Sequence, residues 1–114
     1  MIKIYHNTRC RKSREGLAIL QDSGEDFEVV HYLENIPSKS ELQAVLNLLG
    51  ISPIALIRKN EAVWKENYKG KTLSDEELIK AMISHPKLIE RPIVINGDKA
   101  TIGRPPELIK EILK

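Results

Sequence analysis

Residues 2–32 read IKIYHNTRCRKSREGLAILQDSGEDFEVVHY, and the first half of the fold follows from this stretch. The apolar run at Lys3–Tyr5 predicts a short buried strand, and the spacing of Leu and Ile over 13–20 predicts a helix. Ser23-Gly24 is a stop signal for that helix, and the β-branched and aromatic residues at 27–32 predict a second strand. A strand, a helix and a strand of these lengths form a right-handed unit in which the two strands are parallel.

The single cysteine of the chain, Cys10, lies between the first strand and the helix. Unpaired N–H groups and the dipole of a helix N-terminus lower the pKa of a thiol there, and nearby Arg9, Arg11 and Lys12 are expected to act the same way. A lone cysteine can also be a small buried hydrophobic residue, and a basic cluster can be a solvated face. The order of strand, turn, cysteine, Ser13 and helix favours a reactive thiolate in a small anion-binding site.

The composition is that of one globular domain covering 1–114, since 41% of the residues are hydrophobic and 30% are charged. A net charge of +2, from 18 basic and 16 acidic residues, is too balanced to indicate a nucleic-acid-binding protein. We expect the protein in the cytoplasm, because no secretory leader, transit peptide or membrane-length apolar run is apparent, and we expect a monomer.

Metal and tightly bound cofactors are not expected. One cysteine excludes an internal disulfide and a cysteine-based metal site, and His6, His31 and His85 lack the spacing of metal ligands. The chemistry expected of this chain therefore depends on the thiol, and in a reducing compartment other thiols can recycle it.

The middle of the chain predicts a helical insertion over about 38–84. Ser38 with Glu41, and Ser74 with Glu77, have the spacing of capping boxes, and each pair precedes a helical pattern of apolar residues. Between these two helices, 51–58 predicts a short helix with Ser52 as its cap and Pro53 in its first turn, and 61–71 is expected to be irregular.

The end of the chain predicts strands at 92–95 and 99–102, joined by the hairpin signal Asn96-Gly97, and a final helix. That helix opens at Pro105-Pro106-Glu107 and turns Leu108, Ile109, Ile112 and Leu113 toward the sheet. The order of elements is typical of an α/β protein with a thioredoxin-like four-stranded mixed sheet, flanked by helices, with the insertion between strands 2 and 3.

In such a sheet the third strand runs back toward the cysteine. Arg91 and Pro92, at the start of that strand, are therefore expected near Cys10. Pro92 is also a candidate for a cis peptide bond.

Five motifs in this order resemble the arsenate reductase family related to glutaredoxin, and within it the branch of small arsenate reductase-like proteins. The motifs are Ile4-Tyr5-His6-Asn7 leading to Cys10-X-X-Ser13-Arg14, Tyr32-Leu33-Glu34, Leu56-Ile57-Arg58-Lys59, Glu90-Arg91-Pro92-Ile93-Val94 and Gly103-Arg104-Pro105-Pro106-Glu107. The resemblance covers essentially the whole chain. Thr8 stands where a proline is frequent in the family, and Arg11-Lys12 replaces residues that are often small.

The resemblance implies that Cys10 is the nucleophile and that Arg58, Arg91 and Arg104 hold the oxyanion. It implies reduction of arsenate to arsenite, with glutathione as co-substrate and glutaredoxin as partner, through one catalytic cysteine. Arginine suits such a site because a planar guanidinium can bind two oxygens of a tetrahedral oxyanion at once.

Three further residues are assigned to substrate binding: Arg11, Ser13 and His6. The Ser13 hydroxyl is expected either to donate to the Cys10 sulfur or to cap the following helix, and the two roles are compatible. His6 either tunes the thiolate or shapes the loop that carries it.

Three other functions remain open. One is a glutaredoxin-like thiol transferase whose anion pocket holds glutathione. Another is a redox-linked regulator that binds a protein such as RNA polymerase, although one cysteine cannot form an internal disulfide switch. The last is an inactive structural relative, in which the pKa of Cys10 would be ordinary.

Overall fold

The computed structural model describes residues 1–113, and within them four strands form one sheet. The strands are β1 (Ile2–Tyr5), β2 (Phe27–Val30), β3 (Ile93–Asn96) and β4 (Lys99–Ile102). The α-helices are α1 (Arg11–Ser23), α2 (Lys39–Leu49), α3 (Ala62–Asn67), α4 (Asp75–Ser84) and α5 (Ile109–Ile112), and the short 3-10 helices are η1 (Pro53–Leu56), η2 (Pro86–Leu88) and η3 (Pro106–Leu108).

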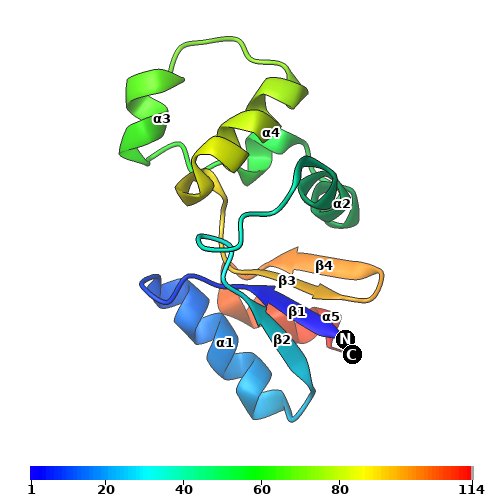
Figure 1. Cartoon of the computed structure of the whole chain (residues 1–114). Helices are drawn as coiled ribbons and strands as arrows, with labels where there is room; N and C mark the ends of the chain where they lie inside the picture. The colour runs from blue at the N-terminus through cyan, green and yellow to red at the C-terminus, as the bar shows by residue number, and fades with distance from the viewer. Residues whose placement is uncertain (114) are drawn as a thin grey trace. The chain divides into compact units, whose positions relative to one another are not determined.

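The chain divides into two compact units (Figure 1). One unit combines 1–35 with the chain from Arg91 onward, and it holds the whole sheet together with α1, η3 and α5. The other unit, 36–90, holds α2, η1, α3, α4 and η2. All the helices between β2 and β3 therefore lie in the second unit, and they include those expected over about 38–84.

The sheet has the strand order β2-β1-β3-β4, in which β1 is parallel to β2 and antiparallel to β3, and β3 is antiparallel to β4. The predicted α/β class and the mixed, thioredoxin-like sheet are confirmed. Register positions the site: Tyr5, the last residue of β1, pairs with Ile93, which in turn pairs with Ile102 at the end of β4. The segments just before β3 and just after β4 consequently lie at the edge where β1 leads toward Cys10.

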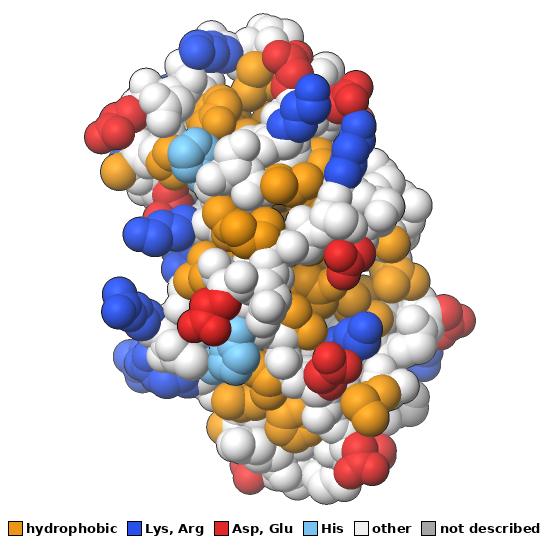
Figure 2. All heavy atoms as spheres, in the orientation of Figure 1, with side chains coloured by type: hydrophobic (Ala, Val, Ile, Leu, Met, Phe, Trp, Pro, Cys, Tyr) orange, Lys and Arg blue, Asp and Glu red, His pale blue; other side chains and the backbone are white. Residues whose placement is uncertain are grey.

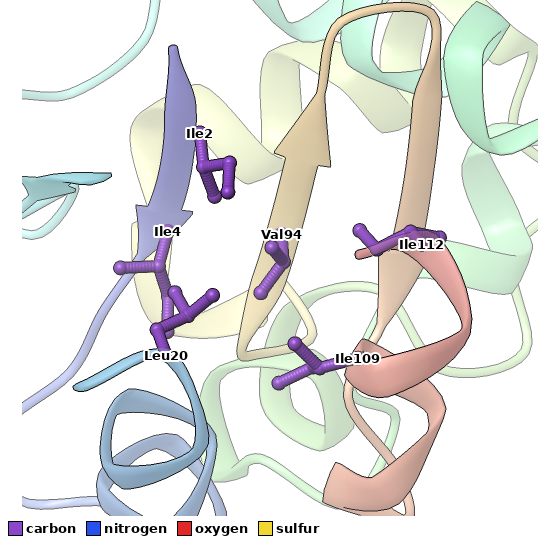
Figure 3. Close-up of a cluster of buried hydrophobic side chains, with 6 residues drawn as sticks. All are labelled: Ile2, Ile4, Leu20, Val94, Ile109 and Ile112. Atoms are coloured by element: carbon purple, nitrogen blue, oxygen red, sulfur yellow. The ribbon is translucent and has the colours of Figure 1, made fainter. Parts of the chain in front are cut away.

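A cluster of buried aliphatic side chains joins the sheet to α1 and α5 (Figure 3). Its buried members are Ile2, Ile4, Leu20, Val94, Ile109 and Ile112. Burying one such side chain stabilises the fold by about 1.5–3 kcal/mol. Ile109 and Ile112 therefore face the sheet as predicted, whereas the expectation for Leu108 is wrong, because this side chain is 40% exposed.

Helix boundaries follow their caps where the caps are specific. Both predicted capping boxes are present, at Ser38 before α2 and at Ser74 before α4. α1 begins at Arg11, two residues earlier than predicted, and it ends as expected at Gly24, which has a φ of 77°. The segment 61–71 is not wholly irregular: it contains α3, whose Trp64 is 7% exposed and stacks on Tyr68 at a ring-centroid distance of 5.5 Å.

Candidate active site

Cys10 lies at the N-cap of α1, half-buried, after a tight loop that leaves β1. Asn7 holds the loop closed: its carbonyl accepts from the Cys10 N–H at 3.0 Å, and its Oδ1 accepts from the Arg9 N–H at 3.0 Å. The second contact is an Asx-type turn, in which a side-chain oxygen replaces a backbone acceptor. The Cys10 carbonyl in turn accepts from the Arg14 N–H at 3.0 Å, so the helix starts directly at the cysteine.

The pKa of the Cys10 thiol is lowered although its burial acts in the opposite direction. Burial has the largest single effect and raises the pKa, but the Ser13 backbone N–H, a hydrogen bond from Arg91 and the charges of Arg91 and Arg104 together lower the pKa by more. Arg104 Nη2 lies 3.6 Å from Cys10 Sγ, within range of a hydrogen bond to sulfur. The thiolate is therefore stabilised by a helix N-terminus and two guanidinium groups.

Arg91 and Arg104 reach the cysteine from segments more than 80 residues away in the chain, because the sheet register brings those segments to one edge. They are also joined to each other: Arg104 Nε donates to the Arg91 carbonyl at 2.8 Å, and the Gly103 N–H donates to the Pro92 carbonyl at 2.8 Å. The Arg91–Pro92 and Arg104–Pro105 peptide bonds are both cis.

Ser13 is fully buried, and its hydroxyl bonds to the loop rather than to the sulfur. Its Oγ accepts from the Asn7 N–H at 3.0 Å and lies 2.7 Å from His6 Nδ1. The expectation that this hydroxyl donates to Cys10 or caps the helix is wrong. Cys10 itself is the N-cap of α1, and the hydrogen bond from Ser13 to the sulfur comes from the backbone N–H. The hydrogen bonds of the Ser13 hydroxyl therefore hold Ser13 in place, and the N–H of the same residue stabilises the thiolate.

His6 completes this buried pair and is 4% exposed. Since the Ser13 hydroxyl accepts from Asn7, it can donate its own hydrogen to His6 Nδ1, which must then be unprotonated. Burial, the charge of His31 and the charge of Arg14 all lower the pKa of His6, and a hydrogen bond with the Ser13 backbone raises it by less than these effects together. The lowered pKa favours the neutral imidazole, and its Nδ1 contact with Ser13 Oγ ties His6 to the start of α1.

The cations that follow Cys10 in sequence, Arg11 and Lys12, are exposed in the first turn of α1. Arg11 Nε and Lys12 Nζ lie 3.2 Å and 3.5 Å from the carboxylate of Glu15, and the Arg11 side chain is 85% exposed. The expectation that Arg9, Arg11 and Lys12 lower the pKa of Cys10 is wrong, because all three side chains are exposed and the pKa is lowered by Ser13, Arg91 and Arg104 instead. Arg11 is accordingly an exposed ion-pair residue on this helix.

Arg58 belongs to the unit 36–90. Its Nη1 lies 2.7 Å from a carboxylate oxygen of Glu90, its Nε lies 3.5 Å from one of Glu61, and its side chain is 14% exposed. Burial lowers the pKa of Arg58, but the two carboxylates raise it by more, so the guanidinium is held charged. The side chain of Arg58 is therefore held in place, as a charged group, by two carboxylates of its own unit.

Two glycines support the site and were not predicted. A Cβ atom on either Gly16 or Gly103 would lie 2.9 Å from Pro92 Cγ and 2.9 Å from Ile109 Cδ1, which is too close for packed atoms. α1 and the segment after β4 can therefore approach Pro92 closely only because both positions lack a side chain. A glycine inside a helical pattern is the signal that could have revealed this contact.

Within residues 1–113 no group of three potential metal ligands comes together. No helix in the described part of the chain is long and apolar enough to cross a membrane.

Comparison with known proteins gives consistent results. The model of the ArsC family matches residues 5–112. The uncharacterized protein YfgD of Escherichia coli strain K12 is 49% identical over 98% of this chain and 96% of its own length, and an arsenate reductase of Haemophilus influenzae is 48% identical over 96% of this chain and 97% of its own. A solved arsenate reductase from Vibrio cholerae superposes with a TM-score of 0.93 at 47% identity, covering 97% of this chain and 96% of that one. The chain therefore belongs to the ArsC family.

Proposed function

We propose that this protein is an arsenate reductase that uses the Cys10 thiolate as its nucleophile, glutathione as co-substrate and glutaredoxin as partner. The observation that carries the proposal is the Cys10 sulfur at the N-cap of α1, with its pKa lowered and Arg104 Nη2 at 3.6 Å. Several relatives of similar length and sequence are arsenate reductases, which supports arsenate as the oxyanion.

Arg91 and Arg104 supply the positive charge that an oxyanion needs beside the sulfur. Charge-assisted hydrogen bonds from a guanidinium contribute about 1.5–3 kcal/mol each where water is excluded. Arg58 is the third arginine of the family pattern, and we include it in the oxyanion-binding set. Arg11 is left out, because its guanidinium is paired with Glu15 on an exposed face.

In the first step the Cys10 thiolate attacks arsenic(V). A sulfur–arsenic bond forms, an arsenic–oxygen bond breaks, and the departing hydroxide takes up a proton to leave as water. Arsenic keeps its oxidation state in this step. The arginines neutralise the negative charges that otherwise keep the thiolate and the oxyanion apart.

In the second step a glutathione thiolate attacks the Cys10 sulfur. A sulfur–sulfur bond forms, and the electron pair of the sulfur–arsenic bond stays on arsenic, which leaves as arsenite. Two thiols have then become one disulfide, which balances the reduction of arsenic(V) to arsenic(III). Glutaredoxin removes the glutathionyl group and regenerates the Cys10 thiol. An external thiol is necessary because the chain has one cysteine.

This chemistry requires a reducing compartment such as the cytoplasm, where glutathione keeps thiols reduced. The proposal therefore includes a cytoplasmic location, and it also includes a monomeric state.

The test is a coupled assay with glutathione, glutaredoxin and NADPH-linked recycling of glutathione. We expect arsenate-dependent oxidation of NADPH that is lost in Cys10→Ser, falls at least about tenfold in Arg104→Ala and stays within about twofold in Arg9→Ala. The proposal fails if turnover does not depend on arsenate. Turnover on a glutathione mixed disulfide, with arsenate inert, would instead identify a thiol transferase.

A further inference from the structure

The unit 36–90 contains a pocket of about 570 Å³ that shares no lining residue with the Cys10 site. Its apolar lining comes from η1, α3, α4 and the segment before α4: Ile54, Trp64, Leu73 and Leu78. Trp64 and Leu78 are buried, whereas Ile54 and Leu73 are half-exposed. The volume is typical of pockets that hold a small molecule or a few residues of a peptide.

The rim of this pocket is cationic. Lys59, Lys65, Lys69 and Lys71 line it, and Asp75 is the one acidic side chain among its lining residues. All four lysines are exposed, and none of them forms an ion pair within the described chain. In Figure 2, hydrophobic surface lies among Lys and Arg side chains over the part of the molecule that contains α3 and α4, and Asp and Glu side chains are visible there as well.

The apolar lining and the lysine rim of this pocket indicate which kind of ligand it can bind. The apolar lining calls for an apolar side chain, and the unpaired lysines call for negative charges around it. No arginine lines the pocket, so it lacks the rigid fork that suits bidentate binding of phosphate. Trp64 is 7% exposed and stacks on Tyr68, so its face is not available as a platform for a nucleic-acid base.

Lysine side chains are flexible, and no buried polar group lies among these four. They are therefore suited to attracting a negatively charged surface, and less suited to fixing the orientation of one small molecule. We propose that this pocket is a docking site for an acidic segment of a partner protein, with one apolar side chain of that segment inserted among Ile54, Leu73 and Leu78 and its carboxylates on the four lysines. This site is independent of the chemistry at Cys10, so its failure would leave the proposed reductase untouched, and the converse also holds.

The chain offers a built-in probe, since Trp64 is its single tryptophan. The ligand for the test is a blocked peptide of glutamates around one leucine, titrated into the full-length protein while tryptophan fluorescence is recorded. We expect a saturable change, and binding at least about tenfold weaker in about 0.5 M salt. We also expect a peptide with serine in place of leucine to bind several times more weakly. The absence of a saturable change, or equal binding of the serine peptide, would overturn the proposal.

Matched variants separate the pocket from net charge. The triple variant Lys65→Glu, Lys69→Glu, Lys71→Glu is expected to lose binding at least about tenfold, while Lys3→Glu, Lys99→Glu, Lys110→Glu changes the net charge equally and is expected to stay within about twofold. Asp75→Asn is expected to tighten binding. Equal loss in both triple variants would overturn the proposal. An equal fluorescence response to an oligouridylate would also overturn it, in favour of a nucleic-acid site, and the wild-type titrations decide the question even if a variant does not fold.

Discussion

At the scale of single residues, Ser13 connects the fold to the chemistry. Its backbone N–H lowers the pKa of the Cys10 thiol, while its buried hydroxyl bonds the Asn7 N–H and His6 Nδ1. One residue therefore both contacts the sulfur through its backbone and ties the first turn of α1 to the loop through its side chain.

Ser13→Ala is expected to destabilise the protein by about 1–3 kcal/mol, because the buried His6 ring and the partly buried Asn7 N–H lose their partner. It is also expected to raise the pKa of Cys10, since the Ser13 N–H is then held less firmly. Urea unfolding measures the first effect, and the pH dependence of thiol alkylation measures the second. Ser52→Ala, at an exposed position where the hydroxyl makes no cap hydrogen bond, is the control and should change neither. An unchanged stability in Ser13→Ala would contradict the buried network.

The buried His6 predicts a pH dependence of stability. Its pKa in the folded protein is below the ordinary value of 6.5, so the unfolded chain binds the proton more tightly. Stability should therefore fall as the pH drops below about 6.5 and should be complete above it.

Measuring this effect requires a background without the thiol, because the lowered pKa of Cys10 adds its own pH dependence at higher pH. The free energy of unfolding of Cys10→Ser should decrease from pH 7 to pH 5.5 more steeply than that of Cys10→Ser with His6→Gln. Parallel curves for the two proteins would show that His6 is not the titrating group.

The sequence singled out Cys10 and Ser13, and it predicted Arg91 near the sulfur, but the causes of the lowered pKa were misassigned. The thiolate was expected to be stabilised by the adjacent Arg9, Arg11 and Lys12, since proximity in sequence was the information at hand. In the structure α1 begins one residue after Cys10, which turns Arg11 and Lys12 toward Glu15. The direction in which a side chain leaves a helix depends on the helix start, and the predicted start was two residues late.

At the scale of elements, one glycine inside α1 and one at its C-cap have different roles. Gly16 is needed for space, because a Cβ there would lie 2.9 Å from Pro92 Cγ and Ile109 Cδ1, whereas Gly24 has open space around it but a φ of 77°. The first glycine allows α1 to pack beside the arginine-bearing segments. The second glycine ends the helix in the left-handed conformation.

Gly16→Ala is expected to cost about 1–3 kcal/mol through overpacking and to lower arsenate turnover, because Pro92 directly follows Arg91. Gly24→Ala is expected to cost about 1 kcal/mol and to leave turnover unchanged. Thermal unfolding and the coupled assay, run on both variants, compare the two. Equal turnover in the two variants would show that the contact of Gly16 with Pro92 does not position the site.

Elements with specific local signals were predictable. The capping boxes of α2 and α4 satisfy backbone donors with nearby side chains. The start of each helix can therefore be predicted from a few adjacent residues. α3 was missed because no cap marks it: Glu61 makes no side-chain cap, and the helix depends instead on the burial of Trp64. Burial is a property of the folded chain that local patterns in a polar segment do not carry.

At the scale of the whole molecule, the order of strands was sufficient to predict that Arg91 and Arg104 come to the cysteine. Register alone brings the start of β3 and the end of β4 to one edge. The partners of Arg58 were not predictable, since any of several acidic residues could have paired with it. The structure selects Glu90 and Glu61, both in the unit 36–90.

Arg58 and Arg104 should therefore differ in what they control. Arg58→Ala is expected to raise the KM for arsenate about tenfold while leaving the pH profile of Cys10 alkylation unchanged, because Arg58 is not among the groups that shift the pKa of Cys10. Arg104→Ala is expected to change both. A shift of the alkylation profile in Arg58→Ala as large as in Arg104→Ala would contradict this division.

The most direct test is the rate of alkylation of Cys10 as a function of pH, with and without arsenate, in the wild-type protein, where no other cysteine reacts. We predict a midpoint below the ordinary thiol value of 9.0 and clear protection by arsenate, since the anion and the thiolate share Arg91 and Arg104. A midpoint at or above the ordinary value, or alkylation that arsenate does not slow, would contradict a thiolate held beside an oxyanion site.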